Sequence, residues 1–117
     1  MSGYGDGYRL ECEARNVLRD NGYAVIRSAS SKTPVDLVAF KVGEMLFVQC
    51  KRAGKMSPAD REALLLLCGV AQATPLMARW RKDGRAARAV EFAELTGPGP
   101  KDLEPWTPDW ALETSGA

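Results

Sequence analysis

Three polar residues interrupt two otherwise apolar, β-rich stretches of this chain. Asp36 stands near the start of the stretch 35–42, and Gln49 and Lys51 stand near the end of the stretch 45–52. Burying a charged group in an apolar strand costs free energy unless the charge is paired or holds a metal ion. An acid, an amide and a lysine placed in this way therefore indicate a functional site built on two strands.

The two stretches are spaced as a β-hairpin. Strands over 35–42 and 45–52 enclose Gly43-Glu44, and a glycine at the first turn position suits a two-residue loop. The remaining residues of both strands are apolar on both faces. This pattern is typical of a central strand that is covered on each side.

The register of this hairpin is expected to bring the polar residues together. Pairing of Val42 with Met45 would place Asp36 directly opposite Lys51. Gln49, two residues before Lys51, would share the same face. The alternatives are a functionless cross-strand ion pair between Asp36 and Lys51, which is costly to bury, and a Gln49 that is merely hydrogen-bonded within its strand.

The elements that must position this cluster follow from hydrophobic periodicity and from stop signals. We expect, in chain order, a helix over 8–20, strands over 23–27, 35–42 and 45–52, a helix over 57–71, strands over 75–80 and 86–92, and an irregular Pro/Gly-rich segment after residue 95. The first helix ends at Asn21-Gly22 and carries an apolar stripe of Leu10, Ala14, Val17 and Leu18. The order predicts an α/β fold with an antiparallel hairpin at its centre, and we expect the last strands to extend the same sheet.

The second helix has a clear start and an unusual apolar surface. Ser57 is a good N-cap, Pro58 fits the first helical position, and Asp60 complements the positive end of the helix. Residues 64–70 are apolar nearly all round. Such a helix is expected to be buried on more than one side, either deep in the domain or at a subunit interface.

Composition bounds the classes of function. The 117 residues suit one compact domain, and the absence of histidine excludes zinc-type ligation and histidine acid/base catalysis. The three cysteines lack metal-ligand spacing and are interpreted as free thiols of a reducing cytoplasm. No apolar run reaches the roughly 20 residues that span a bilayer, so no membrane partner is expected.

Charge is distributed unevenly along the chain. Residues 1–90 hold 15 Lys and Arg against 9 Asp and Glu, a net charge of +6, whereas residues 91–117 hold 1 against 6, a net charge of −5. A basic body with an acidic tail favours a polyanionic partner such as nucleic acid.

Four sequence elements occur in an order that is specific as a set. They are a glutamate on the first helix, an Arg-Ser strand end before a Ser-rich loop, a Val-Asp-Leu-Val-Ala strand and a following x-Lys motif, at Glu11, 27–31, 35–39 and 49–51. The set resembles the archaeal-type Holliday junction resolvases of the PD-(D/E)xK nuclease superfamily, over about residues 7–92. The resemblance implies a restriction-endonuclease-like fold, with a mixed central β-sheet and an antiparallel hairpin flanked by helices. We expect a nuclease domain over 1–95 and a Pro/Gly-rich acidic tail over 96–117, packed on the domain or on a dimer partner.

The resemblance also implies roles for individual residues. The catalytic set would be Glu11, Asp36, Gln49 and Lys51. Mg²⁺, with Mn²⁺ as a substitute, would be held by Asp36, Gln49, the backbone carbonyl of Cys50 and Glu11. Lys51 would stabilise charge on the phosphate or position the attacking water. DNA phosphates would be contacted from loops and strand ends by Arg27, Ser30, Ser31, Lys32, Arg52 and Lys55.

Two of these assignments have alternatives. Gln49 stands where the usual motif of the family has a glutamate, and its carbonyl oxygen can ligate a hard cation without adding charge. Glu11 could instead pair with Arg15, four residues further along the helix.

The leading interpretation is a cytoplasmic, Mg²⁺-dependent, structure-selective endonuclease that resolves four-way (Holliday) DNA junctions by paired phosphodiester hydrolysis. Two symmetry-related cuts suit a two-fold homodimer, for which the apolar second helix is a candidate interface. The alternatives are a repair or restriction-type nuclease of the same fold, a DNA-binding module in which Gln49 marks weakened catalysis, and a protein-interaction domain on a nuclease-like scaffold.

Overall fold

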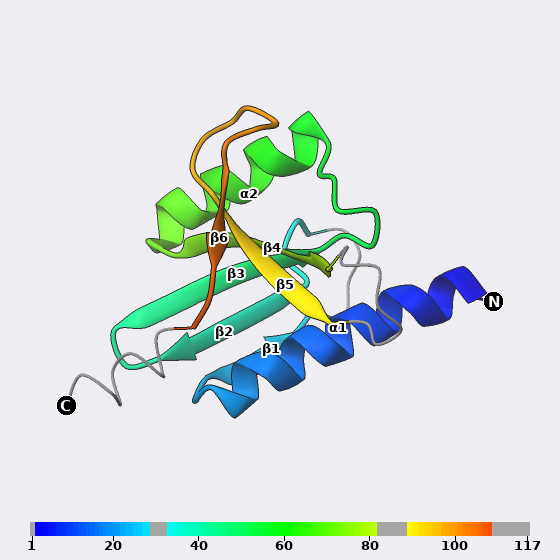
Figure 1. The fold of residues 1–117 in the computed structure, drawn as a ribbon. Coiled ribbons are helices and arrows are strands. Elements are labelled where there is room, and N and C mark those ends of the chain that lie inside the picture. The colour runs from blue at the N-terminus through cyan, green and yellow to red at the C-terminus, as the bar shows by residue number, and fades with distance from the viewer. Residues whose placement is uncertain (1, 29–32, 82–88, 109–117) are drawn as a thin grey trace.

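The computed structural model describes residues 2–28, 33–81 and 89–108 (Figure 1). Its elements are α1 (Ser2–Asp20), β1 (Ala24–Arg27), β2 (Leu37–Lys41), β3 (Glu44–Cys50), α2 (Pro58–Ala71), β4 (Thr74–Trp80), β5 (Val90–Leu95) and β6 (Leu103–Trp106). Within these ranges no helix is long and apolar enough to cross a membrane.

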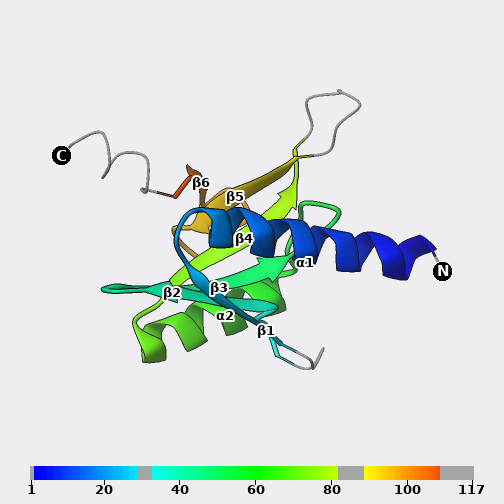
Figure 2. The same ribbon diagram turned by 90° about the horizontal axis from the view of Figure 1, so that it is seen from below.

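One sheet carries all the strands of the described ranges, in chain order from β1 to β6. Neighbouring strands are antiparallel except β3 and β4, which are parallel and are connected through α2. α1 lies on one face of the sheet and α2 on the other (Figures 1 and 2). The structure therefore confirms an α/β fold with an antiparallel hairpin, and the last strands extend the same sheet as predicted.

Two buried clusters hold these three layers together. Alternate residues of the central strands face α1 and pack on Ala14 and Leu18, namely Leu37, Ala39, Leu46, Val48, Leu76 and Ala78. On the other face, Leu64 and Cys68 of α2 pack on Val35, Met56, Met77 and Leu95. Because side chains alternate along a strand, the face of β3 that carries Phe47 and Gln49 is the face toward α2.

α1 confirms the apolar stripe predicted for the first helix. Leu10, Ala14 and Leu18 are fully buried, as expected for residues that recur at helical spacing. The helix begins at Ser2 rather than at the predicted Tyr8. It ends as predicted, and Gly22 after it adopts a φ of +93° that favours glycine.

The hairpin of β2 and β3 forms in a register that differs from the predicted one. Met45 pairs with Phe40 and not with Val42, so the two-residue turn is Val42-Gly43 and not Gly43-Glu44. Gly43 adopts a φ of +77° at the second turn position. Glycine reaches this conformation without the steric cost that other residues meet, and this preference places it there.

The shift by two residues changes partners but leaves every side chain on its predicted face. Asp36 lies just before β2, and its backbone N–H donates to the carbonyl oxygen of Val48 over 2.8 Å. The predicted position of Asp36 opposite Lys51 is therefore wrong. Asp36 instead lies beside the end of β3, where Gln49 is located.

α2 begins as predicted. Ser57 has extended backbone angles, and its hydroxyl accepts a hydrogen bond from the N–H of Asp60 over 3.1 Å. Pro58 occupies the first turn. Replacing such a cap by alanine costs about 1 kcal/mol, so this short motif fixes the position at which α2 starts and the direction in which its first turn presents Asp60.

Of the two alternatives given for α2, the structure excludes burial deep in the domain. Leu64 is fully buried, but Leu66 and Val70 are 71% and 80% exposed. Leu67, at 38% exposed, lies between the buried Leu64 and these two exposed residues. The apolar outer face of α2 is thus uncovered, which leaves the subunit interface as the remaining part of that expectation.

The expectation of irregular structure after Leu95 is also wrong. Leu103 pairs with Leu95 and Trp106 with Phe92, so β6 adds a sixth strand beyond residue 95, the predicted end of the nuclease domain. The ring of Trp106 lies 5.6 Å from that of Phe92 in an edge-to-face arrangement. The predicted strand over 86–92 begins at residue 90 in the structure, and residues 82–88 lie outside the described ranges.

Candidate active site

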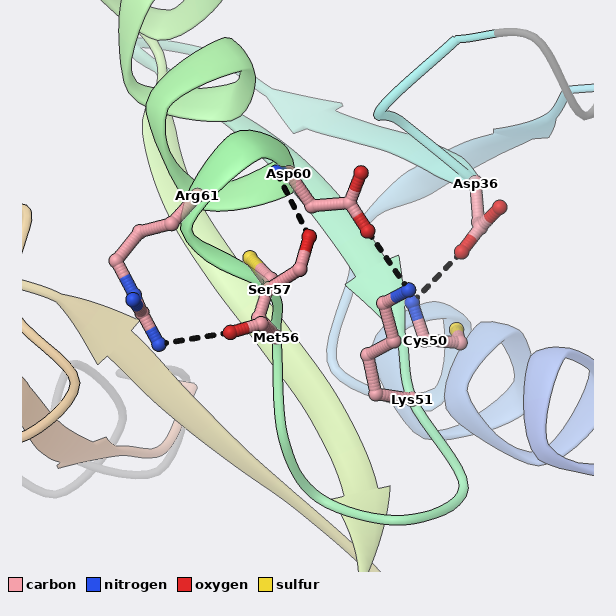
Figure 3. A network of polar contacts seen from close by, with 7 residues as sticks. All are labelled: Asp36, Cys50, Lys51, Met56, Ser57, Asp60 and Arg61. Carbon is pink, nitrogen blue, oxygen red and sulfur yellow. Dashed lines mark hydrogen bonds and ion pairs between the residues drawn. The ribbon is translucent and has the colours of Figure 1, made fainter.

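Asp36 is the centre of the site. The segment before β2 delivers it to the end of β3, where one of its carboxylate oxygens accepts a hydrogen bond from the backbone N–H of Cys50 over 2.7 Å (Figure 3). Its own carbonyl oxygen accepts from the N–H of Ser28 over 2.8 Å. The side chain and the backbone of Asp36 are therefore both fixed by neighbouring strands.

The surroundings of Asp36 disfavour its negative charge. Burial raises the pKa of this carboxyl above its ordinary value, and the hydrogen bond from Cys50 opposes that rise only in part. Glu11 and Asp60 raise the pKa of Asp36 further by repulsion, whereas Lys51 lowers it. A half-buried carboxylate whose charge is disfavoured by burial and by neighbouring acids is one that a bound cation would stabilise.

Gln49 contributes an oxygen that lacks a partner in the described part of the chain. The residue is only 6% exposed, and its side-chain carbonyl oxygen is buried with no hydrogen-bond donor there. An unsatisfied buried acceptor costs about 1 to 3 kcal/mol. This cost speaks against a merely hydrogen-bonded strand residue and suits an oxygen reserved for a ligand.

Lys51 leaves β3 on the side of α2 and meets an acid that sequence reasoning did not assign to the site. Its Nζ lies 3.0 Å from a carboxylate oxygen of Asp60, in the first turn of α2 (Figure 3). The predicted alternative of a simple Asp36–Lys51 ion pair is therefore not the arrangement found. From the sequence, Asp60 was interpreted only as a complement to the helix dipole. Its position in the first turn of α2, three residues after the Ser57 cap, was the sequence feature that could have assigned it to the site.

Glu11 lies near the site but is engaged elsewhere. Its carboxylate lies 2.8 Å from Nε of Arg27, at the end of β1. The predicted alternative partner, Arg15, instead donates hydrogen bonds to the side-chain oxygen of Asn16. The guanidinium of Arg27 also lies over the ring of Tyr8 at 4.9 Å.

Cys50 and Cys68 are unlike nucleophiles. Burial is the largest cause of a raised pKa at both Cys50 and Cys68, and at Cys68 it raises the pKa to about 11. The thiol of Cys50 is thus a packing group, and only its backbone remains relevant to the site.

The oxygen donors fit a hard cation that keeps several waters. The structure shows no group of three or more His, Cys, Asp or Glu able to hold a metal among the residues it describes. The available donors are the Asp36 carboxylate and the orphaned carbonyl oxygen of Gln49. Mg²⁺ is commonly bound through one or two carboxylates with waters completing its shell, so this small set is compatible with it.

The predicted DNA-contacting residues are divided by the structure. Arg27 is at the end of β1, and Arg52 and Lys55 are exposed on the loop that joins Lys51 to α2. Three of the six, Ser30, Ser31 and Lys32, lie outside the described residues.

Comparison with known proteins identifies the family. A profile of the family described as "Archaeal holliday junction resolvase (hjc)" matches residues 2–98. The chain belongs to this family. The matched range includes every residue discussed above as part of the site and ends before β6, so the resemblance read from the sequence is confirmed.

Two members of the Holliday junction resolvase family show the extent of the similarity. A "Crossover junction endodeoxyribonuclease Hjc" of Methanocaldococcus jannaschii is 37% identical over 79 residues, which cover 64% of this chain and 59% of that relative. The structure of Archaeoglobus fulgidus Hjc, a Holliday junction resolvase, matches with a TM-score of 0.60 and 27% identity, over 74% of this chain and 70% of that one. This match confirms the restriction-endonuclease-like fold.

Proposed function

We propose that this chain is a metal-dependent, structure-selective DNA endonuclease that resolves four-way junctions by paired phosphodiester hydrolysis. Its family membership supports the reaction class, and its relatives are named for this activity. One structural observation carries the proposal. The half-buried carboxylate of Asp36, the side-chain oxygen of Gln49 that lacks a partner among the described residues, and the ammonium of Lys51 lie together at the end of β3. Exposed basic residues lie beside them.

Mg²⁺, with Mn²⁺ as its substitute, is the proposed cofactor. Asp36 and Gln49 would hold it together with the backbone carbonyl of Cys50, and Glu11 would assist from α1. A divalent cation bound there supplies Lewis acidity toward the phosphate and lowers the pKa of a bound water. The raised pKa of Asp36 supports this assignment, because burial, together with repulsion from Glu11 and Asp60, disfavours its negative charge and a bound cation would offset that cost.

Lys51 and Asp60 act as a unit in this proposal. The Lys51 ammonium stabilises negative charge on the phosphate that is cut, or positions the attacking water. Asp60 holds that ammonium in place at 3.0 Å, and Ser57 fixes the turn from which Asp60 reaches it. Asp60 is therefore a positioning residue, which touches Lys51 and not the substrate.

The DNA is proposed to cross the basic residues around this site. Arg27, Arg52 and Lys55 would contact phosphates, which position a duplex without reading its sequence. Ser30, Ser31 and Lys32 are proposed contacts from the sequence alone. A cytoplasmic location remains part of the proposal, since the three cysteines are free thiols and a reducing compartment keeps them so.

A homodimer is the proposed assembly, because a four-way junction presents two symmetry-related strands to cut. The outer face of α2 is the proposed interface, with a second copy of the chain as its occupant. Leu66 and Val70 expose apolar surface there, and exposed apolar patches on a folded domain mark interaction surfaces.

One alternative is favoured by a specific observation. Gln49 replaces the usual motif glutamate of the family, so Asp36 alone would bring formal charge to the ligands at the end of β3. A DNA-binding module with weakened catalysis would show junction binding without cleavage. The experiment that separates the two is a cleavage assay on a labelled four-way junction with Mg²⁺, with Mn²⁺ and with chelator.

A further inference from the structure

A second pair of cationic side chains, Arg61 and Lys55, lies next to the candidate active site, and Arg61 has no role in that site. Arg61 follows Asp60 directly, but the two side chains leave α2 in opposite directions (Figure 3). Asp60 reaches Lys51, whereas Arg61 reaches back to the carbonyl oxygen of Met56 over 2.9 Å. The loop from Lys51 to Ser57 therefore separates the two clusters.

Arg61 is buried with its charge uncompensated. It is 5% exposed, and no carboxylate of the described residues lies within ion-pair distance of its guanidinium. Its two Nη groups donate to the carbonyl oxygens of Met56 and, at 3.4 Å, Pro98. Its Nε is buried without an acceptor in those ranges. Arginine is almost never fully buried unless it is paired, because an uncompensated buried charge costs several kcal/mol.

A cavity of about 360 Å³ adjoins this guanidinium. Among the residues that the structure describes, the charged lining consists of Arg61 and the exposed Lys55, with no acid, and the remainder is Gly54, Met56, Met77, Leu95, Pro100 and Leu103. A concave, mainly apolar space with a few placed polar groups is the usual form of a small-molecule site. Two cations and no acid select an anionic ligand, and the apolar wall selects one that also carries an uncharged part.

We propose that this pocket binds a nucleotide through its phosphate, with Arg61 as the buried anchor and Lys55 at the rim. The guanidinium supplies donors in a planar fork that matches a phosphate, including the Nε–H that now has no acceptor. The apolar side chains would pack on the sugar or the base. The nucleotide would come either from the DNA held at the neighbouring active site, in which case the inference rests on the proposed function, or from free mononucleotide.

The competing explanation is structural. Through its bonds to Met56 and Pro98, Arg61 ties α2 to the segments that precede α2 and β6. That role explains the two Nη groups. It explains neither why Nε has no acceptor nor why the guanidinium has no acidic neighbour within the described part of the chain. A structural tie also predicts no affinity for phosphate, so the two explanations differ in a measurable way.

Calorimetric titration of the full chain with thymidine 5′-monophosphate, in chelator, tests the proposal independently of cleavage. Thymidine without the phosphate is the ligand control. We expect saturable binding of the monophosphate only, weakened about tenfold in Arg61→Gln and to a lesser degree in Lys55→Gln. Arg19→Gln removes an exposed charge from α1 and should leave the affinity unchanged. Because Lys55 is exposed, its variant tests the pocket even if Arg61→Gln does not fold.

The possible results distinguish the two sources of the nucleotide, and they distinguish failure of this site from failure of the proposed nuclease activity. Competition between the monophosphate and a bound junction would show that a nucleotide of the DNA fills the pocket, and a ternary complex would show a site for free mononucleotide. Equal binding of thymidine, or affinity for the monophosphate that neither Arg61→Gln nor Lys55→Gln reduces, would overturn the inference. Binding of the monophosphate by a chain that fails to cleave junctions would uphold this site and count only against the proposed nuclease activity.

Discussion

Gln49→Glu is the substitution that probes the candidate metal site most sharply. It restores the acid that the family usually carries, at a position that is 6% exposed and lies beside Asp36. Without a cation, the new carboxylate would be a buried like charge next to a group whose pKa is already raised. An uncompensated buried charge costs about 3 to 5 kcal/mol, and protonation of the new acid limits that cost.

These terms give an expected thermal shift. For a domain of this size, 1 kcal/mol changes Tm by about 4 °C, so the variant in chelator should melt roughly 10 °C below the original chain. If Gln49 ligates the cation, the acid should lower the Kd for Mg²⁺ at least tenfold, which adds about 1.4 kcal/mol at saturating metal. The rise in Tm caused by Mg²⁺ should therefore be about 5 °C larger in the variant.

The assay is thermal unfolding across a Mg²⁺ titration, with Gln49→Met as the matched control. Methionine has a similar volume but no oxygen, so removing the orphaned acceptor should stabilise the metal-free chain by about 1 to 3 kcal/mol and abolish the Mg²⁺-dependent rise. If the titration midpoint of Gln49→Glu equals that of the original chain or is weaker, Gln49 is not a metal ligand and the reasoning fails.

Three further predictions follow from the site and the fold. In chelator, Asp36→Asn should raise Tm at neutral pH, because the raised pKa of Asp36 means that its ionised form destabilises the fold above that pKa. The gain in Tm should vanish as the pH falls below the pKa that this carboxyl has in the unfolded chain. A gain that persists at such low pH would show that the charge of Asp36 is not its cause. Asp60→Asn should slow junction cleavage about tenfold. It should change the free energy of unfolding by less than about 1 kcal/mol, since the ion pair between Asp60 and Lys51 is partly exposed. Cleavage rates and denaturant unfolding measure the two effects, and an unchanged cleavage rate would show that Asp60 does not position Lys51. Leu66→Glu combined with Val70→Glu should convert a dimer to a monomer in sedimentation at micromolar concentration, whereas an original chain that already sediments as a monomer would refute the interface.

The sequence was sufficient wherever short-range chemistry decides the structure. Three of the four residues in the predicted stripe of α1 are fully buried, and Val17 is partly buried. Ser57 with Pro58 predicted the start of α2. The order of motifs predicted the family and the fold, because successive motif residues mark successive elements: Glu11 lies on α1, Arg27 ends β1, Asp36 precedes β2 and Gln49 lies on β3. The polar residues of β3 kept their predicted face, because a register error of two residues preserves the side on which each side chain lies.

The remainder depended on turn geometry and on contacts between distant segments. The turn formed at Val42-Gly43 because the second position needs a positive φ, a choice that periodicity alone does not make. β6 was missed because four residues with a proline resemble a loop until Trp106 packs on Phe92 and Tyr23. Asp60 was missed because it reaches the site only after the loop from β3 folds α2 back over Lys51.

The most direct test of the account is cleavage of a labelled four-way junction beside a linear duplex of the same sequence, with Mg²⁺, with Mn²⁺ and with chelator. We expect paired, metal-dependent nicks near the branch point, with the junction preferred over the duplex. Asp36→Asn should abolish the nicks while the junction is still bound. Binding without cleavage in either metal, or cleavage that survives Asp36→Asn, would contradict the account.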